Sequence, residues 1–116
     1  MDLTKIQNQL RDFSSARDWE QFHTPKNLSM ALSVEASELV EIFQWLTPEE
    51  TNSPDQRQLD SIRSEVADIA MYLIRFCCVL EIDLERAIEE KLIQNGSKYP
   101  VELSKGSAKK YNQREN

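Results

Sequence analysis

Residues 56 to 81 carry an apolar side chain at every third or fourth position, and this spacing limits the fold more than any other feature of the chain. The stripe consists of Leu59, Ile62, Val66, Ile69, Leu73, Phe76 and Leu80. Such a period places the side chains on one face of an α-helix, whereas a strand would need strict alternation. A helix with one continuous apolar face is stable only when neighbouring elements cover that face.

Three other segments show the same period, and no strand pattern of useful length accompanies them. The first segment covers residues 3 to 17, the second covers residues 25 to 46, and the third follows Asp83 through Ile88 and Leu92. Thr24, followed by proline, supplies a capping hydroxyl and a suitable first helical residue for the second helix. Asp83 caps the last helix, and Asn95-Gly96 is expected to end it.

Polar sequence separates and follows these helices. Residues 47 to 58 contain two prolines and read as a linker, within which Thr47-Pro48-Glu49-Glu50 fits a capping box that opens one short turn. From about Lys98 the chain is expected to be irregular and basic. The chain carries −6 in total and this tail carries +3, so the remainder carries −9.

Four helices with short connections predict an antiparallel four-helix-bundle-like domain. At 116 residues, residues 1–116 are expected to form a single domain. Helices of this length enclose a thin core, so assembly into homo-dimers or homo-tetramers is expected to bury more apolar surface.

Composition excludes several classes of function. The acidic net charge argues against non-specific nucleic-acid binding, which needs a basic surface. Arg75 interrupts the longest apolar run, which falls short of the roughly 20 residues of a membrane span. No signal-peptide pattern opens the chain, so a cytoplasmic location is expected. Cys77 and Cys78 are adjacent and show no zinc-ligand spacing, so both are interpreted as reduced packing residues.

Two pairs of carboxylates border the apolar stripes. Glu35-x-x-Glu38 and Glu65-x-x-Asp68 each place two acidic groups on one side of a helix. Partly buried carboxylates on neighbouring helices repel one another unless a cation neutralises them. Four oxygen ligands suit Mg²⁺, or Mn²⁺ as a substitute, better than zinc. Glu41 extends the first column and is expected at a solvent position or in an ion pair. A place beside the ion's ligands, or as an additional ligand, is the alternative.

Other interpretations remain open at this point. A di-iron bundle would need Glu-x-x-His on two helices, and the only histidine, His23, lacks that spacing and is expected to be structural. Glutamate is also common on solvated helix faces, so the chain could be a non-catalytic helical module that oligomerises. Trp19 and Trp45 lie at helix ends, where they either seal a core or face a ligand.

Three stretches resemble the MazG-like all-α nucleoside triphosphate pyrophosphohydrolases, most closely the dCTP pyrophosphatase branch. They are "RDWEQFHTPKNLSMALSVEASELVEIFQW", "EVADIAMYLIRFC" and "KYPVELSKGSAKKY". The resemblance implies hydrolysis between the α- and β-phosphates, releasing a monophosphate and pyrophosphate, in nucleotide-pool sanitation. It also implies sites assembled from more than one subunit.

The resemblance carries over to individual positions. It implies Mg²⁺ ligands at Glu35, Glu38, Glu65 and Asp68, base-pocket aromatics at Trp19, Trp45 and Tyr72, and polar nucleotide contacts at Asn95 and Lys98. Glu35 and Glu38 are the candidate catalytic residues, with Glu38 preferred as the general base. Lys98, Lys109 and Lys110 are candidates to offset charge on departing pyrophosphate. Aromatic stacking tolerates any base, so a pyrophosphatase of relaxed specificity remains an alternative.

Overall fold

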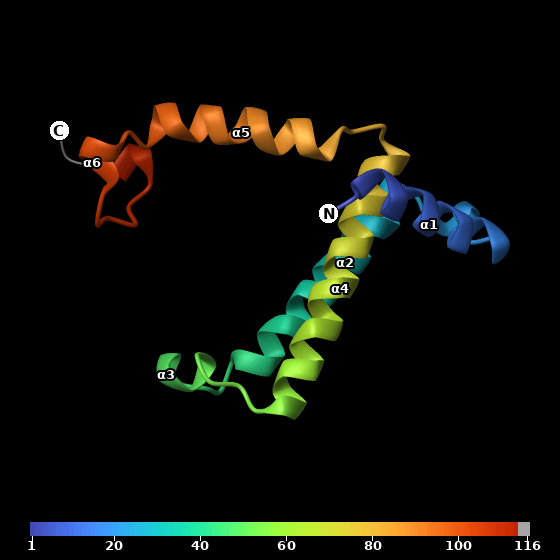
Figure 1. The fold of residues 1–116 in the computed structure, drawn as a ribbon, viewed down its shortest axis with the longest axis horizontal. Coiled ribbons are helices and arrows are strands. Elements are labelled where there is room, and N and C mark those ends of the chain that lie inside the picture. Colours follow the sequence, from blue (N-terminus) through green and yellow to red (C-terminus); the bar gives the residue numbers. More distant parts are fainter. Residues whose placement is uncertain (114–116) are drawn as a thin grey trace. The chain divides into compact units, whose positions relative to one another are not determined.

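The computed structural model describes residues 1–113, and every regular element within them is helical, which confirms the all-α prediction (Figure 1). The elements are α1 (Leu3–Ala16), a 3-10 turn (Glu20–Phe22), α2 (Pro25–Phe43), α3 (Pro48–Thr51), α4 (Gln56–Val79), α5 (Leu84–Lys98), α6 (Val101–Ser104) and a second 3-10 turn (Tyr111–Gln113). They fall into two compact units, residues 1–82 and the residues from Asp83 onward. The single-domain prediction stays a prediction. None of the described helices is long and apolar enough to cross a membrane.

Side chains at the helix starts supply the caps that the sequence predicts. The Thr24 hydroxyl accepts a hydrogen bond of 3.1 Å from a backbone amide in the first turn of α2. Thr47 and Glu50 form the reciprocal capping box that opens α3. The Asp83 carboxylate accepts from a first-turn amide of α5 at 3.0 Å. Each cap satisfies an amide that the helix itself leaves without a partner.

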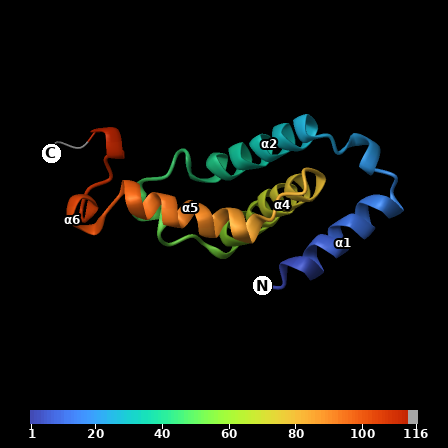
Figure 2. The ribbon, with the colours of Figure 1, turned by 90° about the horizontal axis from the view of Figure 1, so that it is seen from above.

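The first unit is built around α2 and α4, which run antiparallel and lie side by side, while α1 contacts α4 (Figures 1 and 2). Its buried apolar side chains are Leu28, Ile74 and Cys77. Val34 and Val40 on α2 remain 55% and 61% exposed. The core of this unit is therefore thin, as expected. Burial raises the pKa of the free Cys77 thiol, which agrees with a packing role.

The second unit corrects two predictions. The helix stop predicted at Asn95-Gly96 is wrong, because α5 continues through it to Lys98. Glycine is tolerated within the helix, whereas Pro100 disfavours helical geometry at Tyr99, whose φ and ψ are −124° and 64°. The predicted irregular tail is also partly helical, since it forms α6 and the second 3-10 turn. Its Tyr111 ring lies edge-on to Tyr99, with centroids 6.2 Å apart.

The turn after α4 offers a test of backbone strain. Glu81 has φ 54°, in the left-handed region, and its amide donates to the carbonyl of Cys78 at 3.2 Å. Because this conformation costs a non-glycine residue about 1–2 kcal/mol, we expect Glu81→Gly to raise the free energy of unfolding by about 1 kcal/mol. Urea unfolding measures the change. Glu41→Gly, within α2, should instead lower it by about 1 kcal/mol, and a loss of stability in both variants would contradict the strain argument.

Candidate active site

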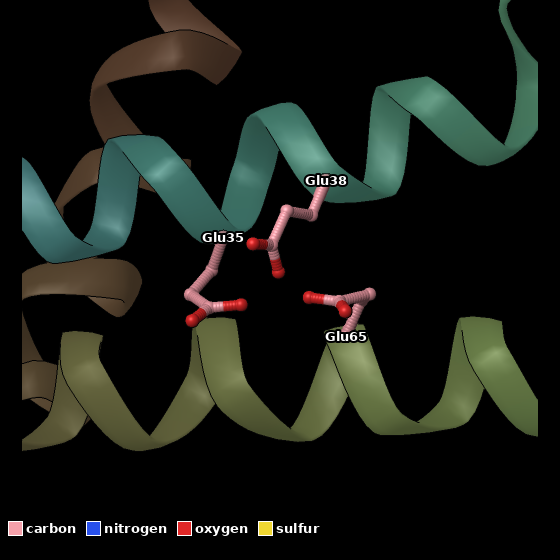
Figure 3. A group of neighbouring side chains, drawn as sticks. All are labelled: Glu35, Glu38 and Glu65. Carbon is pink, nitrogen blue, oxygen red and sulfur yellow. The ribbon is translucent and has the colours of Figure 1, made fainter.

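Three of the four predicted carboxylates meet between α2 and α4 (Figure 3). Glu35 and Glu38 project from successive turns of α2 toward Glu65 on α4. One oxygen from each residue lies within 4.8 Å of the corresponding oxygen of the other two. The three-residue spacing on α2 places both glutamates on the face that packs against α4. We call these three residues the glutamate cluster.

Negative charge in the glutamate cluster is poorly compensated. Glu35 Oε2 and Glu65 Oε2 are buried, and neither has a hydrogen-bond partner among the described residues. The neighbouring Glu65 carboxyl is the largest cause that raises the pKa of Glu35, with desolvation and the charge of Asp68 acting in the same direction. The pKa of Glu38 is raised chiefly by Glu35. Because a hard divalent cation relieves both repulsion and desolvation, the cluster fits an ion of that class.

Asp68, the fourth predicted ligand, lies outside the glutamate cluster. It lies close enough for its charge to raise the pKa of Glu35. It also lines a pocket of about 510 Å³ in the first unit. Residues of α1 and α4, together with Trp19 and His23, form the walls of this pocket. Asp68 therefore connects the acidic cluster with a cavity.

Aromatic side chains form much of this pocket. Trp19 and Tyr72, both predicted to contact a base, line it. The Trp19 ring lies edge-on to Phe13 at a centroid distance of 5.7 Å, and the Arg17 guanidinium lies 3.6 Å from the centroid of the Phe13 ring. A left-handed residue, Asp18 with φ 54°, turns the chain immediately before Trp19. The ring is thus held by packing and by the backbone, and it offers an apolar face to a flat ligand.

The other predicted nucleotide contacts lie elsewhere. Trp45 follows α2 and is 87% exposed, and it does not line the pocket. Asn95 and Lys98 belong to α5 in the second unit. The Lys98 ammonium lies 5.0 Å from the centroid of the Tyr111 ring. The roles of Trp45, Asn95 and Lys98 stay predictions.

The model of the MazG-like family matches residues 30–113, which include all four predicted ligands. This chain belongs to the MazG-like family. The resemblance inferred from the sequence motifs is therefore confirmed.

Relatives of this MazG-like chain include proteins named dCTP pyrophosphatase 1. The bovine protein (Bos taurus) is 41% identical over 112 residues, which covers 94% of this chain and 66% of the relative. The human protein (Homo sapiens) is 37% identical over 113 residues, which covers 94% and 65%. The chain thus spans just under two thirds of the length of these relatives. The fold is also similar to the crystal structure of a pyrophosphatase from Archaeoglobus fulgidus, with a TM-score of 0.82 and 37% sequence identity. The match covers 86% of this chain and 94% of that chain.

Two pocket residues of this MazG-like chain were not predicted as functional. The sequence predicts a structural role for His23 and no functional role for Arg75, which interrupts an apolar run. Both line the pocket, and Arg75 Nε donates to His23 Nδ1 at 3.1 Å. Arg75 follows Tyr72 by three residues and Asp68 by seven, so the helical spacing could have placed it on the same side of α4. Its contact with a residue 52 positions away could not be read from spacing.

The raised pKa values of the glutamate cluster predict how pH affects stability. Between the ordinary glutamate pKa of 4.5 and the raised values, the folded chain binds more protons than the unfolded chain. With EDTA present to remove metal ions, the free energy of unfolding should therefore fall as the pH rises through this window. We expect Glu38→Gln to remove part of that decline. Urea unfolding between pH 4 and pH 7 compares it with the wild type and with Glu89→Gln, a change at an exposed position of α5. An identical pH dependence in all three proteins would contradict this explanation.

Proposed function

We propose that this chain is a Mg²⁺-dependent nucleoside triphosphate pyrophosphohydrolase that prefers dCTP or a modified dCTP. It would release the monophosphate and pyrophosphate and so act in nucleotide-pool sanitation. The observation that carries the proposal is the glutamate cluster beside a pocket lined by aromatic side chains, because two buried oxygens of the cluster find no hydrogen-bond partner within residues 1–113. The names of the relatives support the reaction and the substrate class.

The chain's carboxylates would have two tasks in this reaction. Glu35, Glu38, Glu65 and Asp68 would hold the ion, and Mn²⁺ could substitute for Mg²⁺. When bound, the ion would neutralise phosphate charge and favour attack at the α-phosphorus. Glu38 would accept a proton from the attacking water. The bond between the α-phosphorus and the bridging oxygen then breaks, and pyrophosphate leaves.

The pocket would hold the nucleoside. Trp19 and Tyr72 line it and would stack against the base, while Asp68 would lie at its phosphate end. Trp45 and Asn95 would complete the nucleotide contacts. Lys98, Lys109 and Lys110 would offset charge on the departing pyrophosphate.

Assembly is part of the proposal. Exposed apolar side chains on both main helices of the first unit, among them Val34, Val40 and Val66, would be covered by further copies of the chain. We expect light scattering coupled to size-exclusion chromatography to give the mass of a dimer or tetramer of the 13.5 kDa chain. A mass of one chain at all concentrations would contradict this part of the proposal.

A nucleotide panel tests the reaction. Purified protein is incubated with each NTP and dNTP, with Mg²⁺ or with EDTA, and the products are separated by ion-exchange chromatography. The proposal expects equimolar monophosphate and pyrophosphate, only with metal and fastest for dCTP. Equal kcat/KM for all bases would indicate a pyrophosphatase of relaxed specificity. Orthophosphate alone would contradict the proposed reaction and indicate a different phosphohydrolase. No turnover would contradict it and favour a non-catalytic module.

A further inference from the structure

Arg75 is the only arginine or lysine among the described residues that line the pocket. The walls are otherwise largely apolar and aromatic. A pocket of this kind obtains its specificity from its few polar groups. Arg75 also borders a smaller hollow of about 300 Å³ that Glu81 lines, but no ion pair joins these two residues in the described structure.

The contact between Arg75 and His23 fixes the hydrogen-bonding character of both. Arginine has only donors, so the Nε–H of Arg75 requires an acceptor at His23 Nδ1, 3.1 Å away. The imidazole is then neutral and carries its proton on Nε2, which becomes a donor. Desolvation, and next the charge of Arg75, lower the pKa of His23 and so favour the same neutral form. The charge of Glu20 has the opposite, smaller effect.

The terminal nitrogens of Arg75 remain available. Within residues 1–113 they have no protein hydrogen bond and no ion pair. The pair therefore offers several N–H donors and no free acceptor on its nitrogen atoms. A ligand group that satisfies them must present acceptors.

The position of Arg75 along α4 indicates which part of a nucleotide it would meet. Asp68, Tyr72 and Arg75 all line the pocket and follow one another at helical spacing. Asp68 and Arg75 are seven residues apart, which corresponds to about 10 Å along a helix. This is close to the span from the α-phosphate to the far edge of a pyrimidine. With the phosphates at Asp68, as the proposed function has it, the base edge lies at Arg75.

We propose that Arg75, held by His23, is a specificity-determining residue that selects cytosine by donating hydrogen bonds to its adjacent acceptors O2 and N3. Thymine and uracil carry an N–H at N3, so their N3 donor would face the N–H donors of Arg75 and no hydrogen bond could form there. A guanidinium matches two neighbouring acceptors through its fork of parallel N–H groups. A site built to donate leaves buried groups unpaired when the ligand lacks an acceptor, and this rejects the wrong base.

The test measures binding, so it does not depend on turnover. The dissociation constants of dCMP and dTMP are measured by titration calorimetry with Mg²⁺ for the wild type, Arg75→Gln and the control Arg11→Gln. Wild type and control should prefer dCMP equally. Arg75→Gln should reduce that preference about 10- to 100-fold, because an amide oxygen can also accept from thymine N3–H. Should circular dichroism show that Arg75→Gln is unfolded, Arg75→Lys replaces it, and the preference should fall because the fork is lost.

Other outcomes overturn the inference. An unchanged preference in Arg75→Gln, or equal weakening for both nucleotides, would give Arg75 a structural role only. A wild type that binds both monophosphates equally, or neither, would also overturn it. Selective dCMP binding that depends on Arg75, in a protein without turnover in the nucleotide panel, would contradict the proposed function and leave this inference standing.

Discussion

Glu65→Gln is expected to lower kcat for nucleotide hydrolysis by about a thousand-fold or more, because a metal ligand contributes several kcal/mol of transition-state stabilisation. Glu65 is the only member of the glutamate cluster on α4, and its buried Oε2 has no hydrogen-bond partner in the described part of the chain. Glutamine preserves the shape of the side chain and removes its charge. The fold should therefore survive, and the metal-free protein should not be destabilised, since a source of repulsion is lost.

Steady-state kinetics and circular dichroism together measure this effect. Glu41→Gln is the matched control, since Glu41 lies one turn beyond Glu38 on α2 and is exposed. It should keep kcat within about threefold of the wild type, as expected for a surface position. A folded Glu65→Gln variant with the activity of the wild type would exclude Glu65 from the reaction.

Trp19→Ala should lower kcat/KM for the preferred triphosphate by about 10- to 100-fold, mainly through KM, since base stacking contributes about 1–3 kcal/mol. Trp19 lines the pocket, and Phe13 supports its ring from the side. Trp19→Phe should keep most of the activity, because it retains an aromatic face.

Phe22→Ala is the matched aromatic control. Phe22 lies in the neighbouring 3-10 turn, is 58% exposed and does not line the pocket. Its kcat/KM should stay near that of the wild type. If the kcat/KM of Trp19→Ala also stayed near that of the wild type, the pocket would not be the site that binds the base.

Local sequence signals predicted the main helices and all three residues of the glutamate cluster. The apolar stripe of residues 56 to 81 became α4, and the caps at Thr24 and Asp83 are in place. The carboxylates were found because a helix places residues three apart on one face, so their direction does not depend on distant sequence.

Features that depend on competing local effects or on distant contacts were harder to predict. Gly96 failed as a helix end because Pro100, further on, decides where α5 stops. The packing of α2 on α4 sets which oxygens meet, and it left Asp68 outside the cluster. Likewise, the pocket needs α1 against α4, and the bond between Arg75 and His23 needs that tertiary arrangement.

Binding of Mn²⁺, followed by electron paramagnetic resonance in wild type, Glu65→Gln and Glu41→Gln, tests most directly whether the glutamate cluster holds a divalent cation. We predict equal affinity in wild type and Glu41→Gln and an affinity at least about 10- to 100-fold weaker in Glu65→Gln. Equal Mn²⁺ affinity in all three proteins, or none in the wild type, would contradict the account.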